Sequence, residues 1–166
     1  MLGTRLRPPR PPQAGRGAAD AARARGSAAF QRGDFAAAER LYTLALRLTP
    51  RAPLALLAAD SSPSATALLW SNRSAARASR GDFQGALEDA ERCLRAAPRW
   101  AKAFGRKGAA LVGLGQGGEA VKAYAAGLTL EPASESLRAG LDGARDAIRS
   151  AQARYTEMWG TREAAA

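Results

Sequence analysis

This sequence of 166 residues contains no histidine and only one cysteine, Cys93. The absence of histidine excludes a histidine general base and an imidazole metal ligand. A lone cysteine cannot form an intramolecular disulfide, which suits a reducing compartment such as the cytoplasm. The sequence also lacks a run of about 18 apolar residues, so we expect no transmembrane helix. The length is enough for one domain.

The most informative feature that is present is an internal repeat. Three glycines and three prolines fall in register along the chain: Gly33, Gly81 and Gly115, and Pro50, Pro98 and Pro132. From the second unit to the third, the glycine and proline offsets are identical, with a period of about 34 residues. From the first unit to the second, both offsets are longer by the same insertion of 14. We place the three units at residues 19–50, 67–98 and 101–132, with the insertion within residues 51–66.

Each unit has the pattern of two amphipathic helices. In the third unit, apolar residues recur at spacings of three, four and seven, as on one face of a helix: Ala103, Phe104, Ala110, Leu111 and Leu114. The glycines at 115–118 break this helix, and Pro132 ends the next one. In the first two units the turn reads Arg-Gly-Asp. Glycine supplies the turn there, and Asp34 and Asp82 are expected to cap the helices that follow.

Small residues are expected where the two helices of a unit pack together, at Ala38, Ala86 and Ala120, because large residues would overpack the pair. Cys93 occupies a comparable position, and we interpret it as a buried packing residue rather than a nucleophile. No glycine-rich loop follows a strand, and no group of residues forms a catalytic constellation. We therefore expect no enzyme, no cofactor and no metal site.

A period of about 34 residues that contains two helices and ends in proline resembles the tetratricopeptide repeat (TPR). The resemblance covers residues 19–132 and implies an all-α fold, a three-repeat helical solenoid of antiparallel helix pairs. Two positions depart from the family, which has bulky or aromatic residues where this sequence has Ala22 and Gly117. The departure at Gly117 predicts that the third repeat is the looser hairpin.

Apolar residues continue at helical spacing after the third repeat, from Leu137 to Ile148. Ser134 is a suitable N-cap for such a helix. Because the last repeat of a solenoid leaves an apolar face open, we expect a capping helix over residues 133–157, followed by a tail at 158–166. Whether Trp159 is a core residue or an exposed contact stays open.

The formal net charge of +10 is unevenly distributed. The first 17 residues contain four arginines and no acidic residue, so they carry +4 of it. Residues 1–18 are rich in arginine and proline and poor in apolar residues, and we expect them to be disordered. An organellar transit peptide at residues 1–17 and a simple linker both fit this composition.

Polar residues on the first helix of each unit are candidates for binding, because these helices line the concave groove of such a solenoid. They are Arg23 and Ser27 in the first unit, Asn72 in the second, and Lys102 and Arg106 in the third. Lys102 and Arg106 are four residues apart and therefore share one helix face. The set has many hydrogen-bond donors and few acceptors. Its natural ligand is a carboxylate, or two carboxylates close together.

This set resembles the dicarboxylate clamp of the co-chaperone TPR domains, such as those of the Hsp-organising protein family. The family pattern is Lys and Asn on the first helix, Asn on the second, and Lys and Arg on the third. Asn72, Lys102 and Arg106 match it, whereas Arg23 replaces the lysine and Ser27 replaces the asparagine. The resemblance implies an adaptor that binds the C-terminal Glu-Glu-Val-Asp tail of heat-shock chaperones.

Two other functions stay open on sequence grounds. A TPR scaffold can bind a different peptide, including an internal one that has no free carboxylate. Non-specific nucleic-acid binding by the basic surface is a more remote alternative. The aromatic residues map to packing positions, which leaves no stacking platform for bases.

Overall fold

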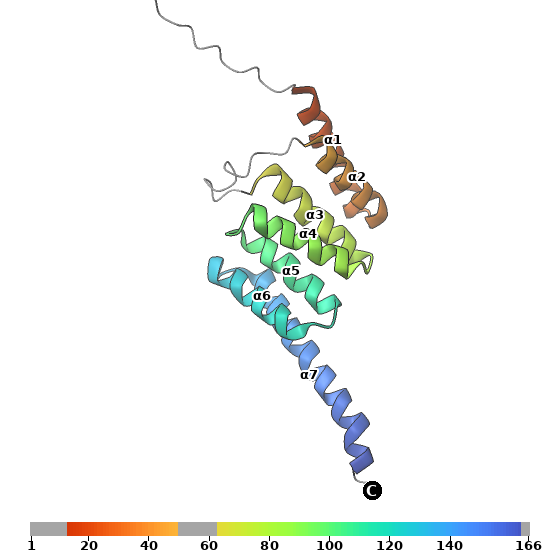
Figure 1. Cartoon of the computed structure of the whole chain (residues 1–166), viewed down its shortest axis with the longest axis vertical. Helices are drawn as coiled ribbons and strands as arrows, with labels where there is room; N and C mark the ends of the chain where they lie inside the picture. Colours follow the sequence, from red (N-terminus) through yellow and green to blue (C-terminus); the bar gives the residue numbers. More distant parts are fainter. Residues whose placement is uncertain (1–12, 50–62, 164–166) are drawn as a thin grey trace, which may run out of the picture.

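The computed structural model describes residues 13–49 and 63–163. These ranges form seven helices and contain no strand: α1 (Gln13–Gln31), α2 (Phe35–Leu48), α3 (Ala65–Ser79), α4 (Phe83–Ala96), α5 (Ala101–Gly113), α6 (Gly117–Leu130) and α7 (Glu135–Glu163). Successive helices pair and stack along the long axis of the molecule, and α7 extends beyond the last pair (Figure 1). The expected all-α helical solenoid is confirmed.

The turns inside the three helix pairs are set by glycine and, in two of them, by aspartate. Gly33, Gly81 and Gly115 have φ values of 79°, 81° and 73°, in the left-handed region that glycine adopts without strain. The side chain of Asp34 accepts a hydrogen bond from the amide of Ala37 at 2.9 Å. Asp82 does the same for Gly85 at 2.9 Å. Both caps were predicted from the repeated Arg-Gly-Asp turn, which is therefore a structural feature.

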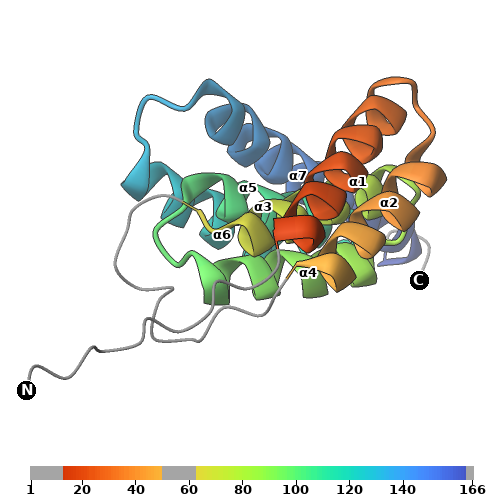
Figure 2. The ribbon, with the colours of Figure 1, turned by 90° about the horizontal axis from the view of Figure 1, so that it is seen from above.

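The contacts between helices identify the concave side of the stack. Helices α1, α3, α5 and α7 contact one another in turn, whereas α2, α4 and α6 make no contacts with each other in the described ranges. In a curved stack, the helices on the inner side approach most closely. The odd-numbered helices therefore line the concave side, and Figure 2 shows the stack from above with α4 at its outer edge.

Small residues allow the two helices of each pair to pack closely. Ala38, Ala86 and Ala120 are each completely buried, as the sequence predicts. Cys93 is also buried, and its thiol donates a hydrogen bond to the carbonyl of Ala67 at 3.3 Å. Desolvation raises the pKa of Cys93 to about 12. A thiol with this pKa is almost entirely protonated near neutral pH, which fits a packing role and not a nucleophile.

Helix α7 closes the open end of the last pair. Leu137, Leu141 and Ala144 are buried against the α5–α6 pair. A side chain at Gly117 would begin only 2.6 Å from the side chain of Ile148, so α7 occupies the space that an aromatic residue fills in the other repeats. This contact offsets the expected looseness of the third repeat. The helix was expected over residues 133–157 and runs from Glu135 to Glu163.

The distal half of α7 extends beyond the stack. Every residue from 149 to 159 is exposed. The rings of Tyr155 and Trp159 lie 6.2 Å apart, and 45% of Trp159 is exposed. Trp159 is therefore a surface residue and not part of the core.

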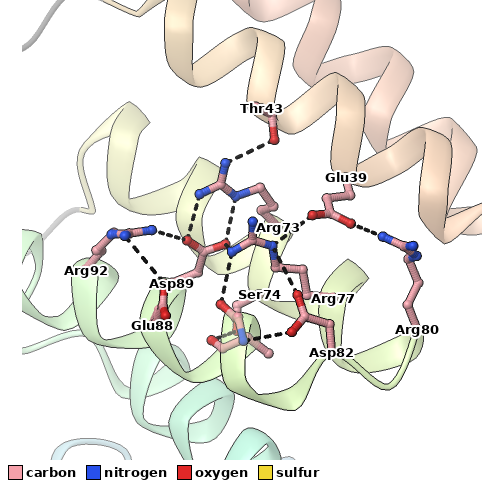
Figure 3. Close-up of polar contacts among 12 residues, drawn as sticks. Glu39, Thr43, Arg73, Ser74, Arg77, Arg80, Asp82, Glu88, Asp89 and Arg92 are labelled. Atoms are coloured by element: carbon pink, nitrogen blue, oxygen red, sulfur yellow. Dashed lines mark hydrogen bonds and ion pairs between the residues drawn. The ribbon is translucent and has the colours of Figure 1, made fainter.

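A buried ion-pair network joins α2, α3 and α4 (Figure 3). Asp89 has no exposed surface, and Arg73 donates to both of its carboxylate oxygens at 2.7 Å. Arg73 also donates to Thr43 on α2 at 3.0 Å. Arg77 lies 3.1 Å from Asp89 and donates to Glu39 on α2 at 2.9 Å. The network fixes the first repeat against the second, and nothing in the sequence pattern predicted it.

Several expectations fall partly or wholly outside the described ranges. The segment expected to be disordered, residues 1–18, lies outside them except for 13–18, which belong to α1. The helix begins directly after Pro12, the last proline before the alanine-rich stretch. Most of the insertion at 51–66 and the last three residues of the tail also lie outside. None of the helices in the described ranges combines the length and apolar character that a membrane crossing requires.

Candidate peptide-binding site

A cavity of about 540 Å³ lies between α5 and the start of α7, on the concave side of the stack. Its lining includes two cations, a phenol, a carboxylate and two hydroxyl groups: Lys102, Arg106, Tyr124, Glu131, Ser134 and Ser136. The two cations come from one face of α5, because they are four residues apart. Two of the five predicted site residues, Lys102 and Arg106, therefore meet in one cavity.

Glycines shape the wall of this cavity. The ring of Tyr124 lies between Gly108 on α5 and Gly140 on α7. A Cβ atom added at Gly108 would lie 2.7 Å from the ring, and one added at Gly140 would lie 2.3 Å from it. A Cβ atom at Gly105 would lie 2.9 Å from Leu137. These close approaches allow α5 and α7 to hold Tyr124 beside Arg106.

Arg106 is the most buried cation of the site. Its Nε atom is buried and has no hydrogen-bond partner in the part of the chain that the structure describes. Burial lowers the pKa of Arg106, and the acidic groups of Cys93, Tyr124 and Tyr42 partly oppose this shift. The guanidinium therefore lies near groups from all three repeats, at the centre of the concave face.

Lys102 is exposed at its end of the cavity. Burial of part of its side chain and, secondarily, the positive charge of Arg106 lower its pKa from the usual value. No ion pair to either residue is present among the described residues. Within those residues, two cations thus face one cavity and neither forms an ion pair.

The three remaining predicted residues lie outside the lining of this cavity. Ser27 is half-buried on α1 and accepts a hydrogen bond from the hydroxyl of Tyr42 at 3.3 Å. Arg23, also on α1, lies 3.7 Å from the carboxylate of Asp20, one turn earlier. Asn72 is half-buried on α3, and no hydrogen bond of its amide to another described residue is present.

Tyr42 on α2 reaches the first helix of its own repeat, where its hydroxyl donates to Ser27. It is also one of the groups near enough to Arg106 to affect the pKa of that guanidinium. Arg23 and Asn72 belong to the same row of inner helices, α1 and α3.

As site residues, sequence reasoning missed the four other polar residues that line the cavity: Tyr124, Glu131, Ser134 and Ser136. One signal was available for Ser136, which stands one repeat period after Lys102 and so continues the repeat into α7. The hydroxyls of Ser134 and Ser136 lie 3.2 Å apart. No comparable signal marks Glu131, because its position depends on how α6 ends against α7. Within the described ranges, no cluster of residues has the composition of a metal site.

Helix pairs that recur with a period of about 34 residues around a cationic concave groove define a tetratricopeptide-repeat domain. The comparisons with known proteins agree with this assignment, although no protein-family model matches the chain. Over 129 residues, the sequence is 42% identical to the Hsp70-Hsp90 organizing protein of Triticum aestivum. That match covers 78% of this chain and 20% of the relative, so the chain spans about one fifth of the relative's length.

Two solved structures that contain a bound peptide are also similar. The first TPR domain of Spaghetti (RPAP3), bound to the HSP90 peptide SRMEEVD, has a TM-score of 0.65 and 25% identity; the match covers 80% of this chain and 94% of that one. The myosin chaperone UNC-45 from C. elegans, in complex with an Hsp90 peptide, has a TM-score of 0.67 and 31% identity over 79% of this chain and 14% of that one. The chain is a TPR domain with homologues among the Hsp70-Hsp90 organizing proteins.

Proposed function

We propose that this chain is a co-chaperone adaptor domain that binds the C-terminal Glu-Glu-Val-Asp tail of Hsp70 or Hsp90 chaperones. Binding occurs through a carboxylate clamp that consists of Arg23, Ser27, Asn72, Lys102 and Arg106. The domain holds a peptide and catalyses no reaction. The proposal places it in the cytoplasm, where its single thiol stays reduced.

One observation carries the proposal: Lys102 and Arg106 face the same cavity, and neither forms an ion pair with a described residue. Burial lowers the pKa of both side chains, which means that their charged forms are destabilised in the unliganded protein. A carboxylate placed between them would relieve this destabilisation. Hydrogen bonds between charged partners contribute about 1.5–3 kcal/mol each, so the site favours an anionic ligand over a neutral one.

The other three residues extend the clamp to a second carboxylate. Ser27 keeps a donor available, because its oxygen accepts the hydrogen bond from Tyr42 and its own hydroxyl proton can point into the groove. Asn72 contributes an amide from the neighbouring helix, and Arg23 contributes a guanidinium at the outer end. A chain terminus that ends in Asp carries two carboxylates close together, which matches two groups of donors.

The comparisons support the same ligand class. The Spaghetti domain was solved with a peptide that ends in Glu-Glu-Val-Asp, and UNC-45 was solved with an Hsp90 peptide. The relative from Triticum aestivum is named for organizing Hsp70 and Hsp90.

The test is a calorimetric titration of the whole chain with the peptide Met-Glu-Glu-Val-Asp, as the free acid and as the C-terminal amide. We expect micromolar binding of the acid and a loss of at least about tenfold for the amide, because the amide lacks one charged acceptor. Equal binding of the two peptides would contradict the clamp and favour a scaffold for internal peptides.

Two variants locate the binding. Lys102→Ala and Arg106→Ala should each weaken binding of the free acid by at least about tenfold while the helical circular dichroism signal is retained. Lys122→Ala and Arg95→Ala are matched controls, because both residues are exposed and lie outside the cavity. Unchanged affinity in both clamp variants would reject the proposed site.

A further inference from the structure

A carboxylate lies in the same cavity as the two clamp cations. Glu131 is the C-cap residue of α6, and its amide donates to the carbonyl of Gly127. Its side chain is exposed and lines the cavity together with Lys102 and Arg106. The site is therefore not uniformly basic: it has a cationic wall on α5 and an acidic edge at the end of α6.

Glu131 has no counterion among the residues that the structure describes. The nearest arginine along the chain, Arg138, donates instead to the carbonyl of Pro132 at 3.0 Å. Lys102 and Arg106 also form no ion pair with Glu131, although they share its cavity. The opposite charges thus line one space of about 540 Å³ without pairing with each other.

The position of Glu131 is also unfavourable for a carboxylate. The end of a helix carries a partial negative charge, which destabilises an acidic side chain there by several tenths of a kcal/mol. A cation from a ligand would neutralise both the carboxylate and the exposed helix end. No cation among the described residues pairs with this carboxylate, and a ligand that carries a positive charge would do so.

We infer that Glu131 determines which C-terminal tails this domain prefers. The preferred ligand is a peptide that has a free terminal carboxylate and a lysine or arginine a few residues upstream. The terminal carboxylate binds at Lys102 and Arg106, and the upstream cation binds at Glu131. This inference rests on the proposed function, and it adds that a tail with only acidic residues near its end is not the optimal ligand.

Electrostatics gives the sign and the size of the effect. Glu131 repels an acidic side chain that enters the cavity from upstream, and it attracts a basic one. A partly exposed pair of charges contributes about 0.2–1 kcal/mol, which corresponds to a change of about 1.4- to fivefold in affinity. The difference between an acidic and a basic residue at the same peptide position includes both effects.

The experiment is a peptide scan in the format of a double-mutant cycle. The parent peptide is Met-Glu-Glu-Val-Asp, and three further peptides each have lysine at one of the first three positions. Each peptide is titrated, as free acid and as amide, into the wild-type chain, Glu131→Gln and Glu135→Gln. Glu135 is the matched control, because it is exposed, lies four residues away and does not line the cavity.

For each protein, the affinity for a lysine peptide is divided by the affinity for the parent peptide. At one peptide position, we expect this ratio to be about two- to fivefold higher in the wild-type chain than in Glu131→Gln. Glu135→Gln should give the wild-type ratio, and Glu131→Gln should bind the acidic parent more tightly than the wild type does. Equal ratios in all three proteins, with binding still dependent on the free acid, overturn the role of Glu131 and leave the clamp standing. Equal binding of acids and amides overturns the clamp and this inference together.

Discussion

In the proposed clamp, Ser27 is one of the two residues of the first repeat that would donate to a bound carboxylate. Its hydroxyl provides one donor on a short side chain, and its oxygen already accepts a hydrogen bond from Tyr42 at 3.3 Å. An asparagine at this position would provide two donors on a longer side chain and could still accept from the phenol. We therefore expect the serine to weaken the proposed clamp without removing it.

Replacement of Ser27 by asparagine should tighten the binding of the free-acid tail peptide. We expect a gain of about two- to tenfold, because part of one charge-assisted hydrogen bond is restored. Calorimetry with Met-Glu-Glu-Val-Asp measures this gain. Ser79→Asn makes the same chemical change at the exposed end of α3 and should leave affinity unaltered. Equal or weaker binding by Ser27→Asn would place the serine outside the binding surface.

The sequence predicted part of this site for a physical reason. The spacing of Lys102 and Arg106 fixes them on one helix face whatever the rest of the fold does. The burial of the Arg106 Nε atom and the presence of Glu131 could not be predicted, because both depend on the packing of α7 against α5 and α6. Local spacing defines which side chains share a face, whereas tertiary packing defines what they face.

Among the helices, α3 and α4 are joined by a salt bridge that is unusual in its burial. Asp89 is completely buried and accepts two hydrogen bonds from Arg73, whose side chain is only 10% exposed. Removing one partner of such a pair leaves an uncompensated charge in the interior. The arginines of this group also reach Thr43 and Glu39 on α2, so the same carboxylate stabilises the boundary between two repeats.

Replacement of Asp89 by alanine should lower the free energy of unfolding by about 3–5 kcal/mol. Urea denaturation followed by circular dichroism measures the change. Asp142→Ala is the control, because Asp142 lies 3.6 Å from Arg145 and both side chains are about 60% exposed. This control should cost less than about 1 kcal/mol. Similar losses in the two variants would show that the buried network does not stabilise the stack.

The helices themselves were predictable where the signal is local. Gly33 and Asp34 define a turn and a cap within two residues, and both act as predicted. The Arg73–Asp89 pair joins residues 16 apart on different helices, and any of the 25 basic residues is a possible partner in the sequence. The length of α7 was underestimated because its end carries no proline to stop it.

For the stack as a whole, the two halves of α7 differ in what they stabilise. The first half buries Leu137, Leu141 and Ala144 against the third repeat. The residues from 149 to 159 are all exposed, and none of them belongs to the buried cluster at that interface. A solenoid needs its terminal apolar face covered, and only the first half of the helix covers it.

Two truncations should separate these halves. A chain that ends at Ser150 should keep the unfolding free energy of the whole chain to within about 0.5 kcal/mol. A chain that ends at Ala133 loses the burial of Leu137 and Leu141. Each fully buried leucine contributes about 1.5–3 kcal/mol, so the third repeat should unfold at a much lower urea concentration. Urea denaturation of the three chains tests this expectation. A large loss in the longer truncation would assign a stabilising role to the exposed half.

The burial of Cys93 gives the middle repeat a built-in reporter of its own opening. The thiol has no exposed surface and a pKa of about 12, so a thiol-specific reagent reaches it only when α4 separates from the helices packed around it. Because it is the only cysteine in the sequence, every labelling event reports that one opening. The rate of alkylation therefore measures how often the central repeat opens. A bound peptide that holds the inner helices together would lower this rate.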